Sequence, residues 1–246
     1  MNKLAEKGSV TVADVSAELS VSAETVRRDL IMLETHGKLR RVFGGAVSAE
    51  QPLHFESLEE RFDRNTDLKI ELSRNAATLI DEGDTVAIDS GSTAKIFAEI
   101  LAERFKSLTI ITYSNTVFNI LKDKFKVILI GGEYIESDDF FGGNIAESML
   151  SQFRFNKAVV FPVAISIENG VETYTAATMG LQKVMLRKAD RVLVLADSDK
   201  FGAYAPMKSF DLSQEHIYVT DGKIDVETKK AFAENGFVLV TGDGEE

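Results

Sequence analysis

Two different hydrophobic patterns divide the chain. Over residues 12–35 apolar residues recur at helical spacing, and the stretch Ser20-Val21-Ser22 interrupts them. The recurring positions are Val12, Val15, Leu19, Val26, Leu30 and Leu33. From residue 68 on, short apolar runs alternate with amphipathic segments. The first pattern predicts two short helices joined by a tight turn, and the second predicts a larger α/β unit.

The larger unit contains seven apolar runs of strand length, and helical segments lie between most of them. The predicted strands are 85–89, 108–112, 127–132, 158–163, 192–196, 216–220 and 237–241. The predicted helices are 68–80, which ends at Gly83, and 93–104, 115–123, 144–152, 176–188 and 225–235. Strands that are apolar throughout are typical of a mostly parallel sheet covered on both faces. We therefore expect a Rossmann-like α/β domain.

The second short helix has the features of a DNA-recognition helix. Ser22 precedes it as an N-cap, and Glu24 suits the positive end of the helix dipole. Its polar side offers Ser22, Glu24, Thr25, Arg27 and Arg28. A helix-turn-helix places the amino-terminal residues of such a helix in the major groove. After Gly37, the run 38–45 predicts a short strand pair, or wing, on which Lys38, Arg40 and Arg41 would contact phosphates.

Composition narrows the class of protein. The net charge is −11, but residues 1–50 hold seven basic and seven acidic residues, so the whole excess lies in residues 51–246. The absence of cysteine and the three scattered histidines argue against thiol catalysis and metal sites, and we expect no cofactor. No apolar run approaches the ~20 residues of a membrane span. We expect a cytoplasmic protein that makes no membrane contact.

The polar stretch 48–67 contains Pro52 and has no sustained periodicity until its end, so we interpret it as a linker. The predicted organisation is a winged helix-turn-helix over residues 1–47, this linker, and a ligand-sensing α/β domain over residues 68–246. Ligands of such sheets bind beyond the carboxyl ends of the strands.

Four predicted strand ends carry small or polar residues that could hold an anion. These candidates are Asp89, Gly91, Ser92 and Thr93 after the first strand, Thr112 and Ser114 after the second, Gly131 and Gly132 after the third, and Lys200 after the fifth. Glycine lets the backbone approach a ligand, hydroxyls add donors, and a helix amino terminus favours an anion. Neither a P-loop nor a G-x-G-x-x-G fingerprint is present.

Both halves resemble the DeoR family of sugar-responsive transcriptional regulators. The run 10–47 is similar to the family's winged helix-turn-helix, through Val21–Leu30 (VSAETVRRDL), Leu33–Gly37 and Arg41–Ala46. The large domain has the family's D-x-G-[ST]-T at Asp89–Thr93, the Gly131-Gly132 pair and the D-S-[SD]-K-F-G run at Asp197–Gly202. The resemblance implies a sensor domain folded like ribose-5-phosphate isomerase and the CoA-transferases. It also implies operator DNA and a phosphorylated sugar effector as partners.

Several positions depart from the family pattern. They are Phe43 in place of histidine, Tyr113 in place of asparagine, Phe161–Ile165 in place of G-A-D-G-I, and Gln182 where a lysine is usual, with Lys183 adjacent. The first helix, Asn2–Lys7, is also shorter. We expect the changes at 161–165 and 182 to alter effector choice or weaken effector binding.

Three functions are weighed on these residues. The first is a repressor gated by a sugar phosphate and assembled as a homodimer or homotetramer. The second is a sugar-phosphate isomerase, which lacks the aspartate that would act as base in the replaced segment 161–164. The third is a winged-helix scaffold for protein contacts without DNA. The sequence favours the first function, and we expect no catalytic residues. It does not identify the sugar phosphate or the operator sequence, and it does not distinguish induction from co-repression.

Overall fold

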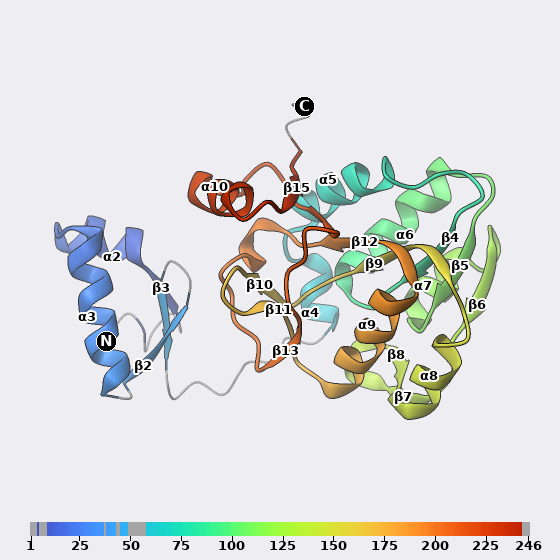
Figure 1. Cartoon of the computed structure of the whole chain (residues 1–246), viewed down its shortest axis with the longest axis horizontal. Coiled ribbons are helices and arrows are strands. Elements are labelled where there is room, and N and C mark those ends of the chain that lie inside the picture. Colours follow the sequence, from blue (N-terminus) through green and yellow to red (C-terminus); the bar gives the residue numbers. More distant parts are fainter. Residues whose placement is uncertain (1–3, 5–8, 37, 43–44, 49–57, 243–246) are drawn as a thin grey trace. The chain divides into compact units, whose positions relative to one another are not determined.

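The computed structural model describes residues 4, 9–36, 38–42, 45–48 and 58–242, in two compact units (Figure 1). The small unit holds the described residues up to 48 together with Gly202–Tyr204, and the large unit holds the other described residues from 58 on.

The small unit is a helix pair beside an antiparallel sheet of strand order β1-β3-β2. Its elements are β1 (Ser9–Thr11), α2 (Val12–Leu19), α3 (Ala23–Thr35), β2 (Leu39–Val42) and β3 (Gly45–Ser48). The Thr11 hydroxyl accepts a hydrogen bond from the Asp14 amide at 3.0 Å and caps α2. Its core contains Leu4, Val12, Val26, Leu30, Leu39 and Ala46. The two predicted helices and the wing strands are confirmed, whereas β1 was not predicted.

The large unit is built on a seven-stranded, fully parallel sheet of order β15-β14-β12-β9-β4-β5-β6. The strands are β4 (Thr85–Ile88), β5 (Thr109–Thr112), β6 (Lys126–Leu129), β9 (Phe155–Val160), β12 (Ala189–Leu195), β14 (Ile217–Val219) and β15 (Val238–Val240). All seven predicted strands are present, with bounds shifted by a few residues. The predicted Rossmann-like α/β architecture is therefore confirmed.

Helices cover both faces of this sheet (Figure 1). They are α5 (Thr66–Ala77), α6 (Ser92–Arg104), α7 (Asn115–Leu121), α8 (Gly143–Leu150), α9 (Ala176–Lys188) and α10 (Val226–Glu234). Alternate strand residues point to opposite faces, so Val86 and Ile88 pack with α5, α6 and α7 while Ala87 packs on the other side. The core on the face of the sheet that carries Ala87 also contains apolar residues of α8, α9 and α10.

Several short elements were not predicted, because they carry too few residues to show a period. Helix α4 (Leu58–Asp63) lies inside the stretch interpreted as a linker, whose residues 49–57 lie outside the described part. Strands β7 (Glu133–Ile135) and β8 (Phe140–Gly142) form a hairpin around the turn η1 (Glu136–Asp138). A further sheet joins β10 (Ala164–Ser166), β11 (Gly170–Thr173) and β13 (Met207–Phe210), and η2 (Ser198–Lys200) follows β12.

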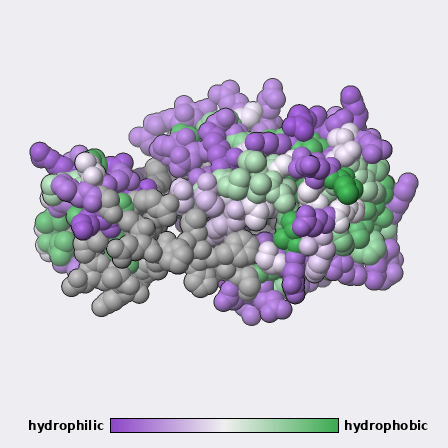
Figure 2. All heavy atoms as spheres, turned by 90° about the horizontal axis from the view of Figure 1, so that it is seen from below, coloured by the Kyte–Doolittle hydropathy of each residue, from purple (hydrophilic) through white to green (hydrophobic). Residues whose placement is uncertain are grey.

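The order of the strands locates a crevice. From β4 the chain continues to β5 and β6 on one side, whereas β9, β12, β14 and β15 follow on the other. The sequence direction therefore reverses between β4 and β9, which is where open α/β sheets bind ligands at their carboxyl ends. In the described residues no helix combines the length and apolar character of a membrane span. Figure 2 shows hydrophobic residues that reach the surface of both units among hydrophilic ones.

Candidate functional site

The polar face of α3 is exposed and its geometry is fixed by hydroxyl groups. Ser22 Oγ accepts a hydrogen bond from the Thr25 amide at 3.1 Å, and the two hydroxyl oxygens lie 2.8 Å apart. Arg27 lies 3.7 Å from Glu24, and both side chains remain largely exposed. Arg28 is exposed on the same helix. The structure thus brings together the predicted recognition-helix residues on one solvent-facing surface.

The wing is tied to this helix by an ion pair. Arg41 Nε lies 3.3 Å from Glu34 Oε2, and the Arg41 amide donates to Glu34 Oε1 at 2.7 Å. Lys38 is exposed at the start of the wing. The side chain of Arg40 lies outside the described residues, as do Phe43 and the predicted first helix apart from Leu4. Strand β2 is therefore held beside the α3 flank that carries Glu34.

In the large unit, Asp89 follows β4 and is completely buried. Its Oδ1 accepts from the Ser90 amide at 2.7 Å and from the Tyr113 hydroxyl. Its Oδ2 accepts from the Phe161 amide at 3.1 Å and from Gln182 Nε2 at 2.8 Å. These four donors fill the acceptor positions of a carboxylate. Burial raises the pKa of Asp89, and the four hydrogen bonds oppose that rise.

This network gives Asp89 a different role from the predicted contact with an effector. With its lone pairs occupied and its side chain buried, Asp89 holds the carboxyl ends of β4, β5 and β9 and helix α9 together. Gln182 in turn accepts from the buried Ser209 hydroxyl at 2.6 Å. Three of the positions that depart from the family pattern, Tyr113, Phe161 and Gln182, thus supply three of the four donors to Asp89.

Three other predicted site residues serve local structure. Thr112 Oγ1 donates to the Ile88 carbonyl at 2.8 Å, and Ser114 Oγ caps α7 by accepting from the Val117 amide at 3.3 Å. A Cβ on Gly132 would come within 2.4 Å of the Gly142 carbonyl oxygen, so glycine is required for packing against β8. Gly131 has open space around it. For these residues the assignment to an effector site stays a prediction.

The amino terminus of α6 retains groups that can bind an anion. Gly91 has a φ of +131°, a conformation that favours glycine, and it starts the helix directly after Asp89-Ser90. Ser92 and Thr93 follow in the first turn and are buried. Thr93 Oγ1 is buried and has no hydrogen-bond partner, which is uncommon for a native hydroxyl. Unpaired amides at a helix start attract anions.

Four cations, Arg61, Arg64, Lys69 and Lys200, interact electrostatically with one another, and we call them the cationic cluster. Lys200 also interacts with Asp89, which lies just before α6. Lys200 Nζ donates to the Pro162 carbonyl at 2.8 Å and lies 4.0 Å from Asp197. The buried Lys69 donates to the neutral backbone carbonyl of Arg61. Since Pro162 follows β9 and Asp197 follows β12, the cluster lies at the carboxyl edge of the sheet.

Acidic groups offset part of this charge. Arg61 pairs with Asp138 of the β7–β8 hairpin, and Arg64 lies 3.9 Å from Asp199. Asn65 donates to Asp197 at 3.1 Å and to Asp199 at 2.9 Å. Burial, and next the charge of Lys200, lower the pKa of Lys69 to about 8. Burial also lowers the pKa of Lys200. The cluster therefore contains the buried Lys69 and the partly buried Lys200, whose charged forms an added anion would stabilise.

Sequence reasoning placed Lys200 here but missed Arg61, Arg64 and Lys69. Lys69 carries a readable signal, because it stands beside Leu68 and Leu72 on the buried face of an amphipathic helix. A lysine on such a face requires a partner. Arg61 and Arg64 had no signal, since they fall in the stretch interpreted as a linker.

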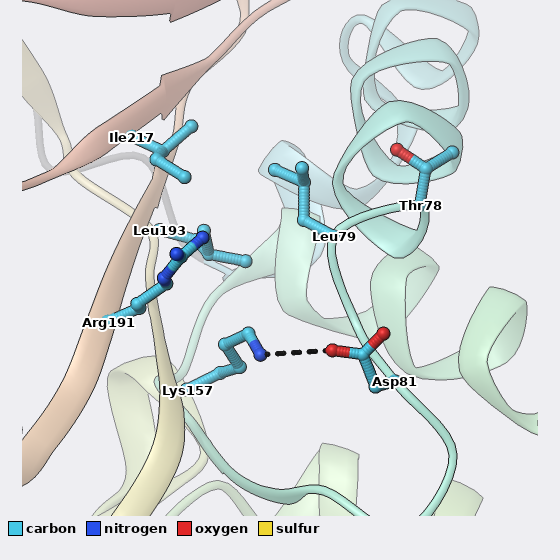
Figure 3. Close-up of a pocket in the computed structure, with 7 residues that line it drawn as sticks. All are labelled: Thr78, Leu79, Asp81, Lys157, Arg191, Leu193 and Ile217. Carbon is cyan, nitrogen blue, oxygen red and sulfur yellow. Dashed lines mark hydrogen bonds and ion pairs between the residues drawn. The ribbon is translucent and has the colours of Figure 1, made fainter.

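A separate cavity of about 420 Å³ lies at the amino-terminal edge of the same sheet (Figure 3). It is lined by Thr78, Leu79, Asp81, Lys157, Arg191, Leu193 and Ile217. Lys157 is already paired there, at 3.5 Å from Asp81 and 3.1 Å from Asp84. None of the predicted effector-site residues lines this cavity, so the cationic cluster and the α6 amino terminus remain the better candidate.

Comparison with solved structures gives a partial likeness. Ribose 5-phosphate isomerase A from Methanocaldococcus jannaschii has a TM-score of 0.42 and 16% identity, over 56% of this chain and 55% of the isomerase. The tetrameric eIF2B-beta2-delta2 complex from C. thermophilum has a TM-score of 0.46 and 12% identity, over 66% and 57% of the two chains. Scores of this size carry no argument about chemistry.

Sequence relatives match nearly the whole chain. A lactose phosphotransferase system repressor of Lactococcus lactis subsp. lactis is 33% identical over 237 residues, which is 94% of this chain and 92% of the relative. A putative aga operon transcriptional repressor of Escherichia coli O157:H7 is 28% identical over 99% of this chain and 92% of the relative. A DeoR-like helix-turn-helix domain matches residues 1–52, and a DeoR C terminal sensor domain matches residues 64–222. The chain therefore belongs to the DeoR family of transcriptional regulators.

Proposed function

We propose that this protein is a cytoplasmic repressor of a carbohydrate-utilisation operon and that a phosphorylated sugar controls its binding to operator DNA. Two of its relatives are named as a lactose phosphotransferase system repressor and a putative aga operon transcriptional repressor, and these names support the sugar-linked role. The observation that carries the effector class is the cationic cluster beside the α6 amino terminus, where Thr93 Oγ1 has no partner. A phosphate is the anion that such cations and amides bind together.

The proposed phosphate position has two sides. Ser92 and Thr93 offer hydroxyls and the first amides of α6, and Lys69 and Lys200 offer ammonium groups. When a phosphate binds Lys69, the ammonium reorients away from the Arg61 carbonyl, so α4 loses a contact that holds it in place. Because α4 is the first described element after the segment that leads from the small unit, this release shifts the population of relative orientations of the two units.

On DNA, the proposed assembly is a dimer or a dimer of dimers. Two α3 helices would enter the major groove about one helical turn apart on a roughly palindromic site. Thr25, Arg27 and Arg28 would approach base edges and flanking phosphates, and Lys38, Arg40 and Arg41 would secure the wing. The acidic large unit would face away from the DNA, because like charges repel.

The isomerase alternative lacks support from the site. Isomerisation through an enediol requires a carboxylate free to take a proton from the sugar. Asp89 is buried with four donors on its oxygens. The segment Phe161–Ala164 after β9 also lacks the aspartate that would act as base in such an isomerase. We propose that the protein has no isomerase activity.

A thermal-shift screen tests the proposed effector class. The purified full chain is heated with a panel of phosphorylated sugars and with their unphosphorylated parents. A ligand at about 100 times its dissociation constant should add about 2.7 kcal/mol of stability. Stabilisation by one phosphosugar and not by its parent is the expected result, and that compound should then change operator affinity. Equal stabilisation by parent and phosphosugar would contradict the phosphate assignment.

A further inference from the structure

A large hydrophobic side chain lies exposed on the helix that carries the DNA-facing arginines. Ile31 of α3 is 49% exposed, and the small unit also exposes Leu19, Val21 and Met32. Arg27 and Arg28 precede Ile31 by one helical turn. An isolated exposed isoleucine needs no explanation. One on a recognition surface does, because water there is displaced when DNA binds.

Helical geometry places Ile31 among the arginines. At about 100° per residue, Arg27, Ile31 and Arg28 fall within an arc of about 100° on α3. Val26 and Leu30, which are buried in the core, lie about 100–140° around the helix from Ile31. Ile31 therefore occupies the middle of the surface that carries the two arginines.

One flank of α3, the one that carries Glu34, is bound to wing strand β2. Arg41 of β2 binds Glu34 through its Nε at 3.3 Å and its amide at 2.7 Å. Glu34 lies one turn beyond Ile31, on the flank shared with Arg27. Met32 lies on the opposite flank, toward Asp29, whose carboxylate would be repelled by phosphates. Ile31 is thus the exposed apolar side chain of α3 between the arginines and the wing.

We propose that Ile31 contacts the C5-methyl group of a thymine in the major groove and so contributes to operator choice. The thymine methyl is the apolar group that the major groove displays, and apolar side chains read it. Ile31 lies about 6 Å along the helix axis from Arg27, which corresponds to about two base-pair steps. The thymine therefore lies within about two base pairs of the one that Arg27 approaches. The inference rests on the proposed binding to operator DNA.

Uracil substitution tests this contact without changing any hydrogen bond. An operator duplex is first selected from a random pool with the full chain, and each thymine in it is then replaced singly by uracil. The affinities are measured by fluorescence anisotropy. For the wild-type protein, removal of one methyl group should weaken binding about four-fold at one position per half-site. Ile31→Ala should bind the thymine and uracil duplexes equally at that position, and Ile31→Val should show an intermediate ratio.

Met32→Ala is the matched control, because Met32 is exposed on the other flank of the same helix; it should keep the wild-type ratio. The salt dependence of binding should be unchanged in Ile31→Ala, since no phosphate contact is removed. The inference is overturned if no thymine discriminates in the wild type, or if Ile31→Ala keeps the wild-type discrimination. A changed oligomeric state in Ile31→Ala with unchanged thymine preference also overturns it and assigns Ile31 to a contact between copies. Absence of any DNA binding by the wild type contradicts instead the proposed function.

Discussion

Gln182 Nε2 donates a 2.8 Å hydrogen bond to Oδ2 of Asp89, and Gln182 Oε1 accepts a hydrogen bond from the Ser209 hydroxyl at 2.6 Å. Both ends of the amide are therefore used, and all three residues are buried. A lysine in place of Gln182 would bring a positive charge to the buried carboxylate. Gln182 is neutral, so none of the side chains that donate to Asp89 carries a positive charge. Lys200 of the cationic cluster interacts with Asp89 electrostatically.

Replacement of Gln182 by leucine is expected to destabilise the large unit. The change leaves Asp89 with one donor fewer and leaves the Ser209 hydroxyl without its acceptor. Each buried unsatisfied group costs about 1–3 kcal/mol, so urea denaturation should show a loss of at least that size. Lys183→Ala, at the exposed neighbouring position, should change stability by less than about 0.5 kcal/mol. Equal stability of Gln182→Leu and the wild type would show that the network contributes nothing.

Replacement of Lys200 by alanine is expected to abolish the response to the effector and to leave DNA binding of the free protein intact. Lys200 lies in the large unit and would contact the phosphate, whereas the DNA-facing residues lie in the small unit. Operator affinity is measured by anisotropy with and without the phosphosugar found in the thermal-shift screen. Lys126→Ala removes an equal charge from an exposed position at the amino-terminal edge of the sheet and should respond normally. A normal response of Lys200→Ala would show that the effector site is elsewhere.

The affinity for the phosphosugar is expected to fall as the pH rises from 7 to 9. The pKa of Lys69 is about 8, so the fraction in its ammonium form decreases about five-fold between pH 8 and pH 9, while the phosphate, with a second pKa of about 6, stays ionised. Calorimetric titration at several pH values measures this dependence. Arginine stays charged over this pH range, so the Lys69→Arg variant should lose the pH dependence of the affinity. A fall of equal size in Lys69→Arg would assign the titration to another group.

The same lowered pKa has the opposite effect on the stability of the ligand-free protein. Lys69 binds its proton less tightly in the folded state, at about 8, than at its ordinary value of 10.5. Between those values the unfolded chain holds more protons, so the contribution of Lys69 to the free energy of unfolding rises with pH over this window. Urea titrations between pH 8 and 10.5 should show a smaller rise for Lys69→Met than for the wild type. Identical pH profiles would contradict the assignment.

Replacement of Arg28 by alanine is expected to weaken binding to all DNA sequences. Arg28 is exposed on α3, and loss of one phosphate contact should reduce the slope of log affinity against log salt by about 0.9. Anisotropy titrations at several salt concentrations, on the selected operator and on unrelated duplexes, measure both effects. Lys126→Ala should leave the slope unchanged. An unaltered slope and affinity in Arg28→Ala would remove Arg28 from the DNA surface.

The sequence predicted long periodic elements well and short contacts poorly. The seven strands were visible because parallel strands buried on both faces are apolar throughout, and the recognition helix was visible from its cap and its period. Helix α4 was missed, because six residues with one buried position, Leu58, show no period. With α4, Arg61 was also missed. The hydrogen bonds of Asp89 depend on which strand ends lie side by side, and local sequence does not contain that information.

The four donors to Asp89 also constrain which substitutions this edge of the sheet can accept. Ser90 follows β4, Tyr113 follows β5, Phe161 follows β9 and Gln182 lies on α9, so one carboxylate connects residues far apart in the sequence. A single exchange of Tyr113 or Gln182 leaves the remaining groups arranged for the lost partner. The effects of the two exchanges on stability are therefore expected to be non-additive, because both residues donate to the same carboxylate. Descendants of this chain that carry only one of the exchanges start from a less stable protein.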